Sequence, residues 1–191
     1  MKTQWVGLRQ AVPLLVVWMI GSWSLSCQGQ NTPRLSVSLG PSYVLFDSKS
    51  VGFANDTSLL GGIGDAAFNV THSFGIMGQI YADYGDHVHL KGWMAGPQVY
   101  HPKWHGLLLA HALFGKTQTR IETIVGNREF ETGISWAAGG GYEFPISQHF
   151  SVRPVMVEYL HTSDFGGQGN LRVSGGLEYR WGELKRHVEA P

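Results

Sequence analysis

A histidine and a serine two residues apart, His161 and Ser163, form the most catalytic-looking pair in this sequence. Residues i and i+2 of a strand share one face, so His161 could take the Ser163 proton during attack on an ester. A carboxylate to orient the histidine is missing from the same-phase positions of the final segment. These positions are Leu171, Val173, Gly175, Leu177 and Tyr179. We interpret the pair as a polar strand end that runs into a loop, with an esterase as the alternative.

Two further groups of residues could bind ligands. In Asp86-His87-Val88-His89, His87 and His89 would share a strand face, but two histidines beside a short loop are more often solvated. Gly139-Gly140-Gly141 lacks the strand-to-helix context of a phosphate loop and is better interpreted as a kink or close approach in a strand. We interpret His111, among apolar neighbours, as a hydrogen-bonded interior residue. The sequence therefore indicates no metal and no cofactor.

Composition narrows the class of protein. The 191 residues carry 14 Lys+Arg and 14 Asp+Glu, so there is no electrostatic basis for binding nucleic acid. Charged residues make up 15%, against about 25% in soluble domains. With 26 glycines and 12% aromatic residues, the chain is not typical of disorder. The single cysteine, Cys27, excludes an intrachain disulfide framework and a cysteine-based zinc site.

The first 26 residues have the pattern of a secretory signal peptide. Lys2 and Arg9 precede an apolar run over residues 11–20, and small residues end at Ser26. Ten residues are too few for a membrane-spanning helix, which takes about 20. A membrane-anchoring helix is the alternative, because Trp23 and Leu25 prolong the apolar stretch. Lipid attachment to Cys27 is a further alternative, because Cys27 directly follows the small Ser26.

The rest of the chain alternates apolar and polar residues with a period of two, which predicts β-strands. The final segment is clearest: Leu171, Val173, Leu177, Tyr179 and Trp181 alternate with Arg172, Ser174, Gly176, Glu178 and Arg180. Eight segments follow such a pattern more or less closely: Arg34–Phe46, Gly61–Val70, Phe74–Tyr84, Val88–Tyr100, Gly106–Lys116, Phe130–Phe144, Phe150–His161 and Leu171–Trp181.

The connections favour an up-and-down barrel. Thr71–Ser73, His101–His105 and Pro145–Gln148 predict tight turns, whereas Asp47–Leu60, Thr117–Glu129 and His161–Gly169 are longer and polar, with Gly85–His87 as an exception. Short turns at one end and longer loops at the other are typical of a bacterial outer-membrane β-barrel. We therefore expect an all-β, eight-stranded antiparallel transmembrane barrel over residues 34–182, followed by a polar tail over 183–191.

The polar faces of the strands should point inward. They are too polar for a soluble core unless their members pair, and the lumen of an eight-stranded barrel is just wide enough for side chains to fill it. Inward glycines would leave room for long charged side chains. We predict a lumen network of Glu143, Glu158, Arg172, Glu178 and Arg180. A soluble lipocalin-like binder, the third alternative, would need an apolar interior.

Three prolines lie inside the expected strands of a barrel that has no edge strand to shelter them. We expect Pro41 to mark a bulge or bend in the first strand. Pro97 and Pro154 should lie near the rim with the short turns, where pairing is ending.

Several runs resemble the outer membrane protein beta-barrel domain family, whose members have OmpA/OmpX-like size. They are Gly96–Tyr100, Ala110–Gly115, Gly139–Gly141, Val152–Val155, Val157–Leu160, Asn170–Arg172 and Tyr179–Gly182. The resemblance implies an outer-membrane location, contact with the lipid bilayer and insertion by the barrel assembly machinery, which reads a terminal aromatic residue, here Trp181. It implies no activity. A membrane-integrity, surface-interaction or small-pore role is expected, with unknown ligands at the loops.

The family resemblance also sharpens the esterase alternative. An outer-membrane lipid A deacylase has a similar His-x-Ser pair on the lipid-facing side of its penultimate strand. His161 and Ser163 match that pair in position and phase.

Overall fold

A computed structural model describes residues 32–46, 57–122, 128–164 and 167–184. The expected signal peptide, Cys27, nearly all of the expected tail and the central parts of three loops lie outside these residues. Within them the chain forms eight β-strands: β1 (Pro33–Phe46), β2 (Thr57–Asn69), β3 (Phe74–Tyr84), β4 (Val88–Lys103), β5 (Gly106–Glu122), β6 (Arg128–Pro145), β7 (Phe150–Thr162) and β8 (Gln168–Glu183).

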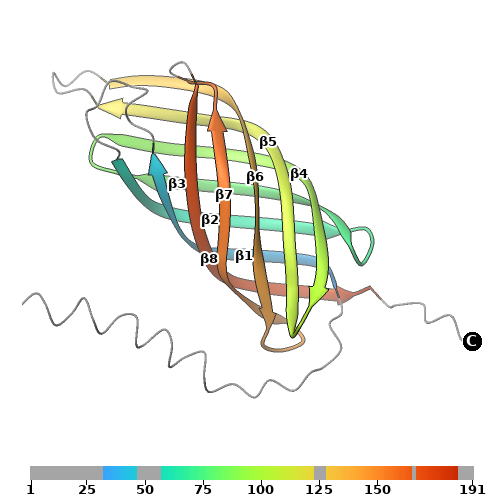
Figure 1. The fold of residues 1–191 in the computed structure, drawn as a ribbon. Helices are drawn as coiled ribbons and strands as arrows, with labels where there is room; N and C mark the ends of the chain where they lie inside the picture. Colours follow the sequence, from blue (N-terminus) through green and yellow to red (C-terminus); the bar gives the residue numbers. More distant parts are fainter. Residues whose placement is uncertain (1–31, 47–56, 123–127, 165–166, 185–191) are drawn as a thin grey trace, which may run out of the picture.

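The strands form one closed antiparallel barrel in which each strand pairs with its neighbours in the chain and β8 pairs with β1 (Figure 1). The expected fold class is therefore confirmed. Pro33 opposes Glu183, so the beginning of β1 and the end of β8 lie at the same rim. The short β2–β3, β4–β5 and β6–β7 turns lie at this rim too. No helix in the described ranges is long and apolar enough to cross a membrane.

Several strands extend further than expected at the opposite rim, which we call the loop rim. Thr117–Glu122 belongs to β5, and Thr57–Leu60 belongs to β2. Thr117 and Thr119 point inward and are buried, whereas Gln118 points outward. Hydropathy alone predicts a loop here, because both faces of this strand end are polar.

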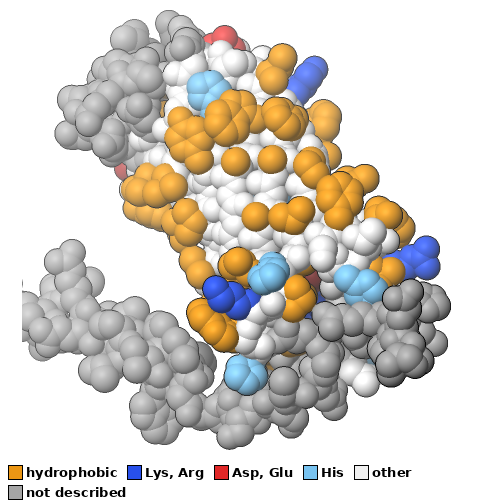
Figure 2. Space-filling view, turned by 45° about the vertical axis from the view of Figure 1, so that its right-hand side comes forward, with side chains coloured by type: hydrophobic (Ala, Val, Ile, Leu, Met, Phe, Trp, Pro, Cys, Tyr) orange, Lys and Arg blue, Asp and Glu red, His pale blue; other side chains and the backbone are white. Residues whose placement is uncertain are grey.

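Side chains alternate across the barrel wall as the period-two pattern predicts. In β1, Ser36, Ser38 and Ser42 are buried in the lumen, while Leu39 on the other face is 68% exposed. Figure 2 shows orange apolar side chains across the middle of the visible wall, with Lys, Arg and His near the two ends. The outward face is thus the apolar face, the reverse of a soluble lipocalin-like barrel.

The expected bulge at Pro41 is absent, and Pro97 lies near the end of the β3–β4 ladder but not near the end of the β4–β5 ladder. Pro41 opposes Gly62, and Pro97 opposes Ile76, in ladders whose register does not shift. Pro97 also lies well inside β4, which pairs with β5 as far as Lys103. Both prolines point outward. Pro41 has no paired partner on β8, and Pro97 has none on β5. A missing backbone N–H therefore disrupts neither strand.

The bulge lies in β7 instead, around Pro154. Tyr142 and Phe144 of β6 oppose Val155 and Val152, and on the other side Gly176 and Ser174 of β8 oppose Arg153 and Met156. In both ladders, three steps along β7 match two along its neighbour, so β7 carries one extra residue. This residue reverses the inward and outward alternation and turns Arg153 into the lumen.

Candidate functional site in the barrel lumen

The lumen holds two buried arginine-centred networks, and the first is built on Arg153. Its guanidinium donates to Glu143 at 2.6 Å through Nη2 and to Asp65 at 2.7 Å through Nη1. Ser38 donates to the same Asp65 carboxylate at 2.9 Å. Because Arg153 lies on β7 and Asp65 on β2, this pair spans the lumen between strands that are not neighbours.

The second network is centred on Arg172 of β8, which is fully buried. Its Nε donates to Glu158 at 2.8 Å, and its Nη2 donates to Gln79 of β3 on the opposite wall. The guanidinium carbon lies 4.4 Å from the centre of the Tyr81 ring. The carboxylate, the amide and the aromatic face offset part of the hydration that this buried arginine loses, while its Nη1 is buried with no hydrogen-bond partner among the described residues.

A glycine allows His111 to reach this second network. His111, Gly139 and Glu158 oppose one another in a row across β5, β6 and β7. A Cβ on Gly139 would lie 2.7 Å from Cγ of Glu158. Without that Cβ, Nε2 of His111 lies 2.8 Å from the Glu158 carboxylate. The expected close approach at Gly139–Gly141 therefore makes room for a charged side chain.

The five predicted lumen residues are all buried, but they are not one network. Glu158 and Arg172 pair with each other. Glu143 pairs with Arg153 instead of with Arg172 or Arg180. Arg180 donates to Ser151 at 3.1 Å, and Glu178 has Glu143 and Arg153 among its electrostatic neighbours.

Arg153 is the residue that sequence analysis missed. It has the same parity as Val155 and Val157, which point outward, so a strict period of two places it on the lipid side. The available signal was Pro154 directly after it, since a proline inside a barrel strand favours a bulge. The expected network contained two arginines, whereas three are buried in the lumen of the structure.

Side chains fill the lumen around these networks. The cavity beside Arg153, which Ser38, Asp65 and Met156 also line, has a volume of about 10 Å³, near the minimum that one water molecule needs. Toward the loop rim, Val44, Phe46, Leu59 and Leu90 are fully buried and point inward. An ion would have to displace these apolar side chains and separate the ion pairs in order to pass.

The catalytic-looking pair does not form a catalytic arrangement in the structure. The ring centre of His161 lies 5.6 Å from that of Trp136 on the outer face, and the backbone N–H of Ser163 donates to the Ile134 carbonyl at 2.9 Å. Among the described residues, no hydrogen bond joins the His161 and Ser163 side chains, and the strand partners of His161 are Trp136 and Gly169. Neither partner is a carboxylate that could orient the imidazole.

The two histidines near the β3–β4 turn are also separated from other metal ligands. His89 points outward against the Tyr84 ring at 5.4 Å, while His87 is exposed in the turn. In the parts of the chain that the structure describes, no three His, Cys, Asp or Glu side chains are grouped so that they could hold a metal ion.

Comparison with known proteins gives matches in structure alone. No protein-family model matches the chain, and no curated protein matches its sequence. Neisserial surface protein A is similar with a TM-score of 0.61 and 10% identity, over 80% of this chain and 100% of that one. The N-terminal β-barrel domain of Pseudomonas aeruginosa OprF is similar with a TM-score of 0.52 and 14% identity, over 81% and 100%.

These likenesses, together with the closed barrel and its apolar outer wall, define the fold class. The chain has the fold of small eight-stranded transmembrane β-barrels.

Proposed function

We propose that this chain is a non-enzymatic, integral outer-membrane protein whose sealed barrel anchors interacting loops at the cell surface. The observation that carries the proposal is the combination of an apolar outer wall with a lumen closed by the Arg153 and Arg172 networks. A lumen that is filled in this way supports anchoring over transport. Interaction with partners then falls to the loops between β1 and β2, β5 and β6, and β7 and β8.

Export and insertion follow from the two ends of the chain. Residues 1–26 act as a cleaved Sec-type signal, and the barrel runs from Pro33 at the start of β1 to Glu183 at the end of β8. Trp181, whose ring centre lies 4.4 Å from that of Tyr179 near the end of β8, supplies the aromatic residue for the barrel assembly machinery. The rim with the short turns faces the periplasm, so the loop rim faces the outside.

A gel-shift experiment tests the membrane-barrel part of the proposal. The full-length chain is expressed in a bacterial host, outer membranes are isolated, and samples in detergent are run with and without boiling. A closed membrane barrel resists cold detergent, so we expect the band to shift on heating. A soluble periplasmic protein with no shift would overturn the proposal.

Single-channel recording tests the sealed lumen. We expect the refolded protein to give no stepwise conductance in a planar bilayer, because the ion pairs and apolar side chains fill the lumen. The Arg153→Ala variant is the comparison, since loss of this side chain removes the bridge between β7 and β2. Steady conductance of the unaltered protein would favour the small-pore role instead.

The esterase alternative has a direct test of its own. Lipid A from cells with the protein and from cells without it is compared by mass spectrometry. We expect an unchanged acyl pattern, because His161 lacks an orienting carboxylate. Loss of an acyl chain that depends on Ser163 would replace the proposed function with a lipid hydrolase.

A further inference from the structure

A hollow on the outer wall opens toward the rim with the short turns, and we call it the rim groove. Its volume is about 670 Å³. The described lining includes Val99, His101, Leu108, Ala110, Gly140 and Tyr142, which come from β4, β5 and β6. Val155 of β7 and Ser73 of the β2–β3 turn also contribute. The rim groove therefore lies across four strands of the wall that we propose to face lipid.

Small residues form the floor of the rim groove. Ala110 opposes Val99 on one side and Gly140 on the other, and Gly140 in turn opposes Val157. A Cβ on Gly140 would lie 2.6 Å from the carbonyl oxygen of Leu109, so this position requires glycine. The row thus has branched side chains at both ends and little or no side chain between them. A floor of this shape suits a flexible hydrocarbon chain.

The end of the rim groove nearest the rim carries a cation. Lys103 follows two residues after His101, has the same outward phase and is exposed. The Tyr142 hydroxyl donates to the Lys103 carbonyl at 2.6 Å, which holds this end of β4 beside the groove. The Lys103 ammonium lies 4.9 Å from the centre of the Trp104 ring. A ring face attracts a cation but leaves its full charge.

The charge of Lys103 is not neutralised by a carboxylate. Among the described residues Lys103 forms no ion pair, and the described lining of the groove includes no Asp or Glu. Asp65, Glu143 and Glu158 pair with arginines on the other side of the wall, inside the lumen. A ligand in the rim groove therefore meets an apolar hollow with a permanent positive charge at one end.

A second hollow on the outer wall, of about 470 Å³, lacks such an end. Its described lining, which includes Ala66 and Ile80, contains no Lys, Arg or His. Leu35 and Phe68, which oppose each other, lie between this hollow and the rim with the short turns. An apolar hollow alone accepts any hydrocarbon, whereas the rim groove favours a hydrocarbon chain that is attached to an anionic group.

From this arrangement we propose that the rim groove binds one phospholipid of the adjacent leaflet, with an acyl chain over Ala110 and Gly140 and the phosphate at Lys103. The Lys103 ammonium supplies a charge-assisted hydrogen bond to the phosphate. Tyr142 and Trp104 are residue types that favour the headgroup level, where the phosphate lies. The inference rests on the proposed membrane location and adds a specific lipid site that an anchoring barrel does not require.

Native mass spectrometry tests the inference by counting bound lipids. The full-length chain is expressed, and the protein is purified from outer membranes in mild detergent and titrated with phosphatidylglycerol. We expect one site that binds this lipid more tightly than the rest of the wall. Lys103→Gln should weaken the site about tenfold, because one contact to a charged group is lost. Ala110→Leu should also weaken it, because the longer side chain fills the floor.

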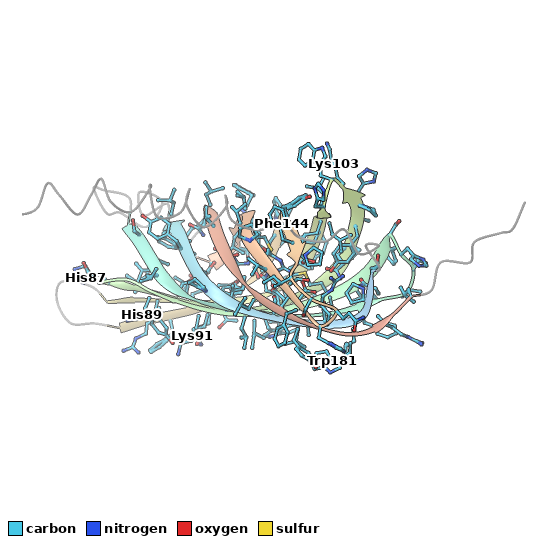
Figure 3. The ribbon with its side chains drawn as sticks, turned by 90° about the horizontal axis from the view of Figure 1, so that it is seen from below. His87, His89, Lys91, Lys103, Phe144 and Trp181 are labelled. Atoms are coloured by element: carbon cyan, nitrogen blue, oxygen red, sulfur yellow. The ribbon has the colours of Figure 1, made fainter. Side chains whose placement is uncertain are left out.

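Lys91→Gln and Ala66→Leu are the matched controls. Lys91 is also exposed beside an aromatic ring, 5.6 Å from the centre of that of Tyr84, but toward the opposite end of the barrel from Lys103 (Figure 3). Ala66 lines the second hollow. We expect both controls to bind the lipid as the unaltered protein does. Equal weakening in the controls, or no weakening in Lys103→Gln or in Ala110→Leu, would overturn the inference.

Further arms of the experiment identify the ligand. We expect diacylglycerol, which lacks the phosphate, to bind weakly, and inorganic phosphate to leave the lipid bound. Equal binding of diacylglycerol would mean that hydrocarbon alone is recognised, and displacement by inorganic phosphate would mean a site for free anions. Dimers that Ala110→Leu abolishes would mean that a second copy occupies the groove. Each of these results would overturn the inference. A heating shift on gels is recorded for every variant, so failure of the membrane barrel itself is seen separately.

Discussion

Arg153 and Arg172 each contact a buried partner on a strand that is not a neighbour of their own, Asp65 on β2 and Gln79 on β3. Arg153 joins two carboxylates that lie 78 positions apart in the sequence, Asp65 and Glu143 (143 − 65 = 78). Removal of one partner from a buried ion pair leaves the other charge without compensation. Substitution of a single charged residue in these networks should therefore change the free energy of unfolding.

Arg153→Ala should lower the free energy of unfolding by about 3–5 kcal/mol, since it leaves the Asp65 and Glu143 carboxylates without their shared cation. Urea unfolding of the refolded protein in lipid vesicles, followed by tryptophan fluorescence, measures the change. Arg34→Ala is the control, because Arg34 is exposed beside Phe68 and should matter little. Equal losses in the two variants would contradict the structural role of Arg153.

Glu158→Gln and Arg172→Met should be non-additive. The two side chains are in direct contact at 2.8 Å, and contacting residues show interaction energies of about 0.5–3 kcal/mol in double-mutant cycles. The same unfolding measurement on both single variants and the double variant gives this energy. A pairing of Arg172→Met with Glu143→Gln, which belongs to the other network, should be closer to additive.

At the scale of the element, the β7 bulge decides which residues enter the lumen. One extra residue near Pro154 keeps both Arg153 and Glu158 inward, although their positions differ by an odd number. Among the described residues, the six ladders that do not involve β7 have no register shift. The composition of the lumen therefore depends on one local irregularity.

Deletion of Pro154 should destabilise the barrel by several kcal/mol, because it restores strict alternation and removes either Arg153 or the residues after it from their inward positions. The heating shift on gels and urea unfolding are the measurements. Pro41→Ala, at a proline with no register shift, is the control and should change stability by about 1 kcal/mol or less. A deletion variant as stable as the unaltered protein would mean that the bulge is dispensable.

For the whole molecule, the apolar wall fixes the environment in which the barrel is stable. Ile80 lies near the middle of β3 and is 65% exposed, whereas Leu45 lies near the loop rim on β1 and is 44% exposed. A charged side chain is costly only where hydrocarbon surrounds it. The position of a residue along the barrel axis therefore predicts how much a charged substitution on the outer wall lowers the stability of the barrel.

Ile80→Arg should cost about 2–4 kcal/mol in vesicles, and Leu45→Arg about 1 kcal/mol or less, because the cost of a charge falls from the bilayer midplane to the interface. Unfolding from vesicles measures both values. If both substitutions cost little, the outer wall does not face lipid and the membrane location is wrong.

Alternation in the sequence already determined the eight strands, their order and which face is polar, because a period of two leaves only the choice of inside or outside for each residue. The same alternation placed Glu143, Glu158, Arg172, Glu178 and Arg180 in the lumen. The alternation could not predict which of these side chains pair with one another. Arg153 reaches Asp65 across the lumen only because a bulge reverses the phase of β7 and barrel closure brings β7 and β2 face to face. Local patterns carry no information on which residues become neighbours across a closed sheet.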